Sequence, residues 1–245
     1  GAALSLSGAA FQGLLRNPLA DPYVVGISSG AALGASFAIV MGLKATFAGL
    51  GVPVIAFCFA LATMLGVYSL AHLARGSFSE SFLLVGVVTG TTLWALVMLL
   101  LSLSGRYLQE VIFWLMGTLS TADFQLLGMA TGVTLIGGAG LLYLARDLNS
   151  LAFGEESAAL MGSDVVRVRT WVILFASFLV GGAVSAAGII VFVGLIVPHS
   201  ARRLIGPDHR VLLPFSALLG FAFLAAADLL ALTLIPPNKL PECVI

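Results

Sequence analysis

Long apolar runs with almost no charge recur along this chain and leave few folds open to it. Only 9% of its 245 residues are charged, whereas 60% are hydrophobic and the mean hydropathy is +1.13. A soluble domain has about 25% charged residues, so this chain cannot build an ordinary water-facing surface. Segments of about ten residues with alternating polarity, typical of membrane β-barrels, are also absent. We therefore expect an all-α protein that crosses a membrane several times.

The length of the apolar runs predicts where the chain crosses. A bilayer core of about 30 Å requires roughly 20 helical residues. The region 170–205 has 36 residues and would extend about 54 Å as one helix, so it must break. We expect the break at Gly181, Gly182 or Gly188, which gives spans near 170–187 and 189–205. The other predicted spans are 23–43, 52–74, 81–103, 124–145 and 211–232.

The basic residues test this division, because short cytoplasmic loops are enriched in Lys and Arg. Eight of the eleven fall on one side of the predicted spans, and three fall on the other. The larger group is Arg16, Arg75, Arg146, Arg167, Arg169, Arg202, Arg203 and Arg210, and the smaller group is Lys44, Arg106 and Lys239. The larger group marks the cytoplasmic side. Net charge is zero, which gives no basis for nucleic-acid binding.

Glycines recur every fourth residue at two places in the predicted spans. They are Gly26, Gly30 and Gly34 in one span and Gly86 and Gly90 in another. In lipid, small residues at this spacing let helix backbones approach closely. The glycines therefore indicate helix packing, and a face that lines a substrate pathway is the functional alternative.

The longest cytoplasmic segment, residues 146–169, predicts two short helices. Asn149 or Ser150 is placed to cap the first, and Gly154 breaks it. Glu155 and Glu156 open the second helix near its positive dipole end. The segment also has apolar patches, formed by Leu148, Leu151, Phe153, Leu160 and Met161. These patches either rest on the protein's own helix ends or dock on a cytosolic partner.

Other polar positions favour structural roles. Residues 106–120 predict an amphipathic helix at the outer membrane interface. Asp228 lies in an apolar run, where we expect it to cap a broken helix end. His199 follows a proline and indicates packing or hydrogen bonding rather than metal ligation. No phosphate-binding loop, metalloprotease motif or nucleophile–base pair is present, so we expect no catalysis, no metal site and no bound cofactor.

Four blocks of sequence resemble the FecCD family, the membrane permeases of ABC importers for iron-siderophores, haem and cobalamin. They are SGAAFQGLLRNPLADPYVVGISSGAALG, LNSLAFGEESAALMG, GLIVPH and DHRVLLP, in the family's order. The resemblance implies the type II permease fold of ten helices with an inverted repeat. It implies a single permease domain over residues 1–245, truncated at both ends, from the second half of helix two through helix nine.

The resemblance also implies roles for particular residues. The family's coupling helices, which sit in a groove of the cytoplasmic ATPase, match Leu148, Asn149, Leu151, Phe153, Gly154, Glu155, Glu156, Leu160, Met161 and Gly162. The family's cytoplasmic gate matches Ser79, Glu80 and Ser81, although Glu80 replaces a small hydroxyl residue of the cobalamin permease. At the outer face, Leu232 stands where that permease has an arginine that meets the binding protein.

The function implied is that of a non-enzymatic permease in the bacterial inner membrane. It would form a homodimer, with two cytoplasmic ATPase subunits that use ATP and Mg and an extracytoplasmic binding protein. The outer helix favours an iron-siderophore or haem cargo, with cobalamin or molybdate as the alternative. An ion-coupled secondary transporter and an intramembrane enzyme are the competing classes. Asp228 is the one clear ionisable candidate for the former, and the catalytic set required by the latter is absent.

Overall fold

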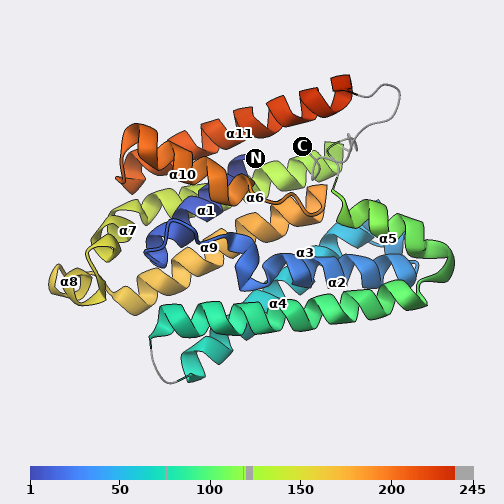
Figure 1. Ribbon diagram of the computed structural model, residues 1–245, viewed down its shortest axis with the longest axis horizontal. Coiled ribbons are helices and arrows are strands. Elements are labelled where there is room, and N and C mark those ends of the chain that lie inside the picture. The colour runs from blue at the N-terminus through green and yellow to red at the C-terminus, as the bar shows by residue number, and fades with distance from the viewer. Residues whose placement is uncertain (75–76, 118, 120–123, 235–245) are drawn as a thin grey trace. The chain divides into compact units, whose positions relative to one another are not determined.

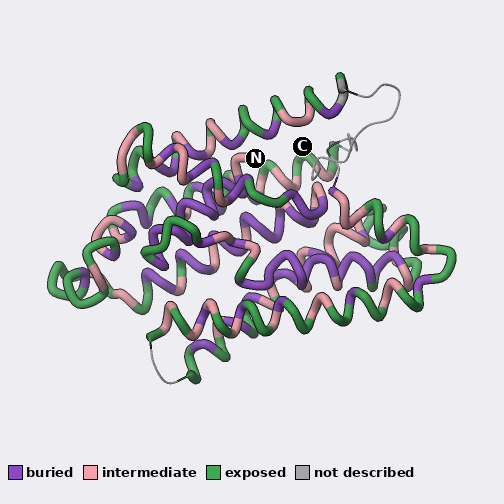
Figure 2. The backbone as a smooth tube through the Cα atoms, in the orientation of Figure 1, coloured by how far each residue is buried: buried purple, intermediate pink, exposed green. Residues whose placement is uncertain are grey.

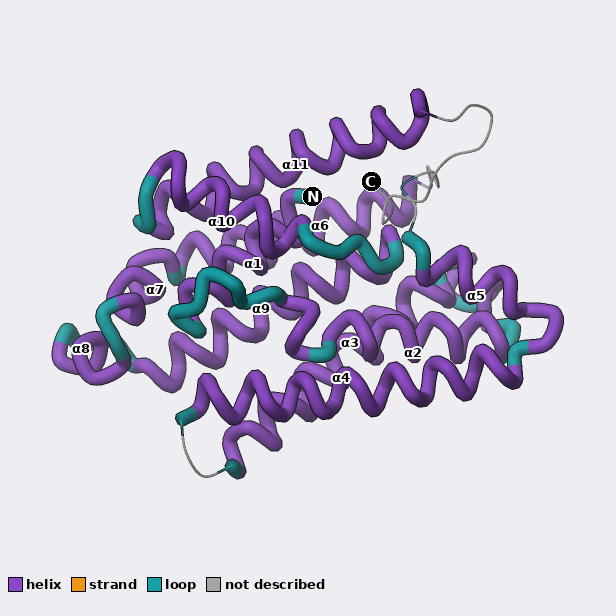
Figure 3. Tube along the Cα trace, viewed as in Figure 1, coloured by secondary structure: helices purple, strands orange, loops and turns teal. Residues whose placement is uncertain are grey.

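The computed structural model describes residues 1–74, 77–117, 119 and 124–234, and these residues form helices joined by short loops, with no strand among them (Figures 1 and 3). Short 3-10 turns lie at Pro22–Val25, Leu43–Ala45, Phe47–Gly49 and Gly105–Tyr107. The α-helices are α1 (Ala2–Leu14), α2 (Ile27–Val40), α3 (Gly51–Leu73), α4 (Phe78–Leu103), α5 (Leu108–Leu115), α6 (Phe124–Tyr143), α7 (Ala145–Ala152), α8 (Glu155–Leu160), α9 (Val165–Ala187), α10 (Val193–Ile205) and α11 (His209–Leu234).

Five of the helices in the described part of the chain are long and apolar enough to cross a membrane. They are α3, α4, α6, α9 and α11, with mean hydropathies between 1.6 and 2.2 over an 18-residue window. The surfaces of these helices expose many large hydrophobic side chains, which suit contact with lipid. The prediction of an all-α chain with several membrane-spanning helices is confirmed.

The region 170–205 breaks as its length requires, and the break lies at its last glycine before α10. Helix α9 continues through Gly181 and Gly182 and ends at Ala187, and Gly188 has φ +75°. The Tyr23 hydroxyl donates to the Ile190 carbonyl in the break at 2.6 Å. Helix α10 has 13 residues and spans about 20 Å, which is shorter than the bilayer core. The shorter span expected at 189–205 is therefore helical only over Val193–Ile205.

Backbone contacts divide the chain into two compact units. Unit 1 comprises residues 1–22, 131–180 and 192–229, and unit 2 comprises the described residues of 23–130, 181–191 and 230–245. Each unit draws on separate stretches of the chain, so segments that are distant in sequence pack together within it.

In unit 1, helix α1 packs against α10 and α7. Pro198 has no N–H to donate to the carbonyl of Gly194, four residues earlier. A Cβ on Gly8 of α1 would lie 1.8 Å from that carbonyl oxygen, so the two backbones meet there. The next carbonyl of α10, at Leu195, accepts a hydrogen bond from the side chain of Gln12 at 3.2 Å. Helix α1 therefore lies against the carbonyl that Pro198 leaves without a donor from its own helix.

In unit 2, helix α2 is almost entirely buried and packs against α3 and α4 (Figures 1 and 2). A Cβ on Gly30 would lie 2.2 Å from the Thr63 hydroxyl, and one on Gly34 would lie 2.7 Å from Cβ of Phe59. In the same unit, Gly86 of α4 lies against the backbone of Val25, and Gly90 lies against that of Gly26. All five predicted glycines are buried at such helix contacts, which favours packing over pathway lining.

Candidate functional site

The candidate coupling segment, residues 146–169, forms two short helices in unit 1, with Gly154 between them. Gly154 has φ +106°, which favours glycine, and it separates α7 from α8 as predicted. Glu155 and Glu156 lie in the first turn of α8, also as predicted. However, α7 begins at Ala145, so Asn149 and Ser150 lie inside it. The prediction that one of these two residues caps α7 is therefore wrong.

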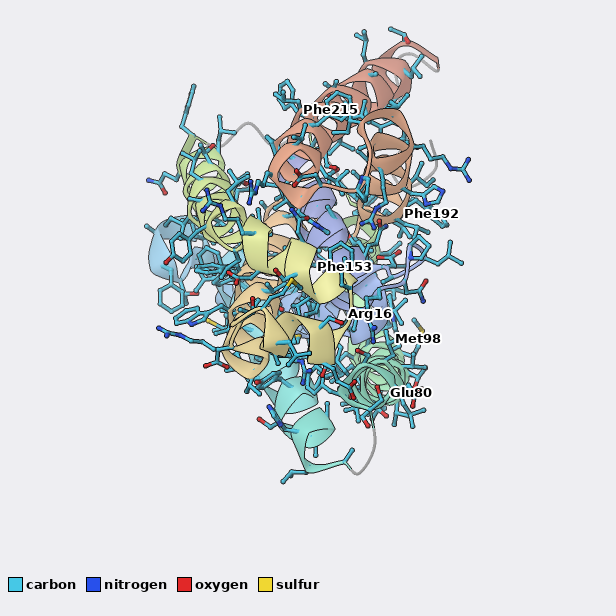
Figure 4. All side chains as sticks on the ribbon, turned by 90° about the vertical axis from the view of Figure 1, so that its left-hand side faces the viewer. Arg16, Glu80, Met98, Phe153, Phe192 and Phe215 are labelled. Carbon is cyan, nitrogen blue, oxygen red and sulfur yellow. The ribbon has the colours of Figure 1, made fainter. Side chains whose placement is uncertain are left out.

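The apolar residues of the coupling segment divide into buried and exposed groups. Leu148 and Leu151 are buried within unit 1, and α7 packs against α1. Phe153, Leu160 and Met161 are instead 77%, 90% and 56% exposed. Figure 2 shows mostly exposed residues around α8, and Figure 4 shows Phe153 from the side of unit 1 that carries the segment. Leu148 and Leu151 therefore rest on the protein's own helices, and docking of the three exposed residues on a partner stays a prediction.

Polar contacts hold α8 in place. Glu155 of α8 pairs with Arg169 of α9. The side chain of Arg169 is buried, with 8% of its surface exposed. The Ser163 hydroxyl donates to the Asp147 carboxylate of α7 at 3.2 Å. Glu156 is exposed and forms no hydrogen bond or ion pair with the described residues. Glu155 and Glu156 are therefore not equivalent.

Asn149 connects α7 to the beginning of α11. Its Nδ2 donates to Oδ1 of Asp208 at 2.6 Å. Its Oδ1 accepts from the backbone N–H of His209 at 2.8 Å and lies 2.7 Å from Nδ1 of the same histidine. The side chain of Asn149 therefore contacts two consecutive residues at the start of a helix about 60 positions further along the chain.

Asp208 caps α11 from the preceding position. Its carboxylate also accepts from the backbone N–H of Arg210 at 3.0 Å. That backbone N–H and the Asn149 amide lower the pKa of the Asp208 carboxyl below its ordinary value. The carboxylate is consequently ionised at neutral pH and accepts hydrogen bonds at this helix end.

The predicted gate residues lie in the first turn of α4. Ser79, Glu80 and Ser81 are helical, because α4 begins at Phe78 rather than near residue 81, and Glu80 is exposed (Figure 4). Arg75 and Gly76, shortly before α4 in sequence, lie outside the described residues. The gating role of the three residues stays a prediction.

The predicted outer helix contains α5, which an ion pair anchors within unit 2. Glu110 of α5 pairs with Lys44, a residue of the smaller basic group. Arg106 lies over the ring of Tyr107 at 4.9 Å. The helix ends at Leu115, and residues 118 and 120 of the predicted segment lie outside the described part of the chain. The side chain of Leu232, predicted to lie at the outer face, is also outside the described part of the structure.

Two other polar predictions have different outcomes. Asp228 does not cap a broken helix end, because α11 continues through it to Leu234. His199 lies inside α10, and its Nδ1 is buried without a hydrogen-bond partner among the described residues. Within the same residues, no group of three His, Cys, Asp or Glu side chains is placed to hold a metal ion.

The sequence predictions omitted Asp208, His209 and Arg169 as partners of the coupling segment. An aspartate before an apolar run is a typical helix N-cap, so the start of α11 at DHRVLLP had a recognisable signal. No such local signal connects these residues to Asn149 or Glu155, because the pairs are distant in sequence.

Known proteins resemble this chain over most of its length. Residues 1–245 match the sequence model of the FecCD transport family. The uncharacterized ABC transporter permease protein YvrB of Bacillus subtilis is 44% identical over 243 residues, which are 98% of this chain and 69% of that protein. The cobalamin import system permease protein BtuC of Halobacterium salinarum is 46% identical over 231 residues, 94% of this chain and 62% of that protein.

Two further matches extend the comparison. The hemin transport system permease protein HmuU of Yersinia pestis is 39% identical, over 98% of this chain and 73% of that protein. A solved structure described as an inward-facing conformation of a putative metal-chelate type ABC transporter superposes with a TM-score of 0.91 and 32% identity. That match covers 99% of this chain and 77% of the solved chain.

Proposed function

The chain belongs to the FecCD transport family, and from this premise we propose that it is the membrane-spanning permease subunit of an ABC importer. The observation that supports this most is the match of the whole chain to a family of permeases, together with a helical fold that superposes on such a transporter. The chain spans between 62% and 73% of the three named relatives, so the activity of the complete protein is part of the proposal.

The proposed mechanism uses shape and movement rather than covalent chemistry. Two copies of the permease would surround a pathway, and a cytoplasmic ATPase would dock on each. The exposed Phe153, Leu160 and Met161 suit this docking, because large apolar side chains at a helix tip favour protein interfaces. ATP binding and hydrolysis in the partner would displace the coupling segment and alternate access between the two sides. Ser79, Glu80 and Ser81 would form the cytoplasmic gate.

For the cargo, we propose a metal chelate delivered by an extracytoplasmic binding protein. The named relatives include cobalamin and hemin permeases, and others in the family carry the names ferric enterobactin and molybdate. The outer helix favours an iron-siderophore or haem compound, whereas the cobalamin permease of Halobacterium salinarum is more similar to this chain than the hemin permease is. Cobalamin is therefore the alternative that the experiment must include.

Transport by the reconstituted system tests the proposal. The full-length permease, its ATPase and its binding protein would be placed in proteoliposomes with radiolabelled ferric siderophore, haem or cobalamin. We expect one chelate to accumulate only when ATP is present, and accumulation to stop when the ATPase carries an inactivating substitution. Accumulation that follows an ion gradient without the ATPase would contradict the proposal and indicate a secondary transporter.

A further inference from the structure

The amide of Asn149 has a defined orientation between α7 and α11. An ionised carboxylate only accepts hydrogen bonds, so the NH2 group of Asn149 must be the part that faces Asp208. The carbonyl oxygen therefore faces His209 and accepts its backbone N–H. Since that oxygen also contacts Nδ1 of the imidazole, Nδ1 must hold a proton. Three polar groups at the start of α11 thus fix one side chain of α7.

The other side of His209 is closely enclosed. The residue is 1% exposed, and its Nε2 is buried without a hydrogen-bond partner among the described residues. A Cβ on Gly13 of α1 would lie 2.3 Å from this nitrogen. The imidazole therefore has little room to turn away from Asn149.

This contact supplies part of the N-terminal cap of α11. The first four N–H groups of a helix lack partners within the helix. In α11, Asp208 satisfies the N–H of Arg210, and Asn149 satisfies that of His209. The start of a membrane-spanning helix thus depends on a side chain from the coupling segment. Leu148 and Leu151, on the same short helix, are buried within unit 1.

We propose that Asn149 is a positioning residue that transmits displacement of α7 to the first turn of α11 during transport. The inference rests on the proposed function, because it assigns the movement to an ATPase docked on the coupling segment. The two proposals concern different contacts of the coupling segment. Asn149 acts through contacts within its own chain, whereas Phe153, Leu160 and Met161 are exposed to a partner.

Three variants of the full-length permease test the link. Asn149→Ala removes all three contacts. Asn149→Asp places a second carboxylate against Asp208, and like charges repel. The swap Asn149→Asp with Asp208→Asn restores one carboxylate and one amide in exchanged positions. Ser150→Ala is the matched control, since Ser150 lies next in α7 and, among the described residues, its hydroxyl bonds only to the Arg146 carbonyl of the same helix.

Each variant would be reconstituted with the ATPase and binding protein, using ferric siderophore, haem and cobalamin as cargo probes. ATPase affinity, uptake per ATP hydrolysed, and hydrogen exchange in the first turn of α11 would be measured. Losing hydrogen bonds to a charged group predicts a fall of about tenfold in uptake per ATP for Asn149→Ala and Asn149→Asp, with ATPase affinity unchanged. Exchange at residues 209–212 should rise. The swap should recover most of both losses, and Ser150→Ala should match the wild type.

The outcomes separate the two proposals. Wild-type protein without ATP-driven uptake overturns the proposed function and, with it, the coupling role of Asn149. A transporting wild type whose Asn149 variants keep the same uptake per ATP overturns only the coupling role. Unchanged exchange at residues 209–212 in Asn149→Ala overturns the structural link itself. The single variants could fail to assemble with the ATPase. In that case, the link is overturned if the swap variant, Asn149→Asp with Asp208→Asn, assembles but gives no more uptake than vesicles without permease.

Discussion

Adjacent glutamates at the start of α8 have different surroundings. Glu155 turns toward α9 and pairs with the buried Arg169, while Glu156 remains in the solvent. Removing the partner of a buried charge is costly, whereas removing an isolated surface charge is nearly neutral. The two residues therefore contribute differently to stability, although the sequence presents them as a pair.

Glutamine substitutions separate them. Glu155→Gln should lower stability by about 1 kcal/mol, a value discounted because Glu155 is half exposed, and thus lower the melting temperature by a few degrees. Glu156→Gln is its matched control and should melt within about one degree of the wild type, as surface substitutions usually do. Thermal unfolding of the purified permease in detergent would measure both. Equal melting temperatures would show that the ion pair with Arg169 adds nothing.

Residue roles were predictable from sequence only where they depend on neighbours in the chain. The break at Gly154 and the acidic first turn of α8 follow from local conformation and helix dipole. Asn149 was expected to act as a cap, and it does cap a helix, but that helix is α11 rather than α7. Its partners are about 60 residues away, and no local pattern identifies a contact at that separation.

Helix contacts in unit 2 depend on the absence of side-chain atoms at particular glycines. The backbone of α2 approaches α3 so closely at Gly34 that a methyl group would lie 2.7 Å from Phe59 and 2.9 Å from the Ile55 carbonyl. Gly66, on α3 itself, has no atom within 4 Å of the equivalent position. Spacing alone could not separate these two glycines, since both lie in apolar helices.

Alanine at these two positions should affect stability differently. Gly34→Ala should destabilise the permease by about 1–3 kcal/mol through overpacking. Gly66→Ala should leave stability unchanged or raise it by up to about 1 kcal/mol, because alanine favours helix. Thermal unfolding in the same detergent would compare the two variants. A stable Gly34→Ala protein would mean that α2 and α3 lie further apart than the structure places them.

Element boundaries followed from sequence where length was decisive. The 36 residues of 170–205 exceed any bilayer, so a break was required, and Gly188 provides it. The length of α10 was not predictable, because residues 189–192 are apolar yet remain outside the helix. Hydropathy measures the free energy of transfer into lipid and not backbone conformation. It therefore could not show that residues 189–192 lie outside the helix.

At the scale of the whole molecule, the basic residues predict which ends of the helices face the cytoplasm. The loop containing Lys44 belongs to the side with three basic residues, and α8 belongs to the side with eight. This asymmetry predicts that the Lys44–Glu110 ion pair lies on the extracytoplasmic side of the membrane and α8 on the cytoplasmic side.

Cysteine labelling tests this topology. In a chain with Cys58 and Cys243 replaced by serine, Ala45→Cys and Ala159→Cys would be introduced singly at exposed positions. We expect a membrane-impermeant maleimide to label Ala45→Cys in spheroplasts and Ala159→Cys only after lysis. Both substitutions keep the Lys44–Glu110 and Glu155–Arg169 ion pairs. The reverse labelling pattern would invert the assigned orientation.

The proline in α10 also has a consequence for how this chain tolerates sequence change. The Gly194 carbonyl that Pro198 leaves without a helical donor is the atom that a side chain at position 8 would strike. The two positions, 190 residues apart, are therefore expected to be epistatic. Pro198→Ala would restore the donor and draw the carbonyl back toward its own helix, so Gly8→Ala should cost less in that background than in the wild type.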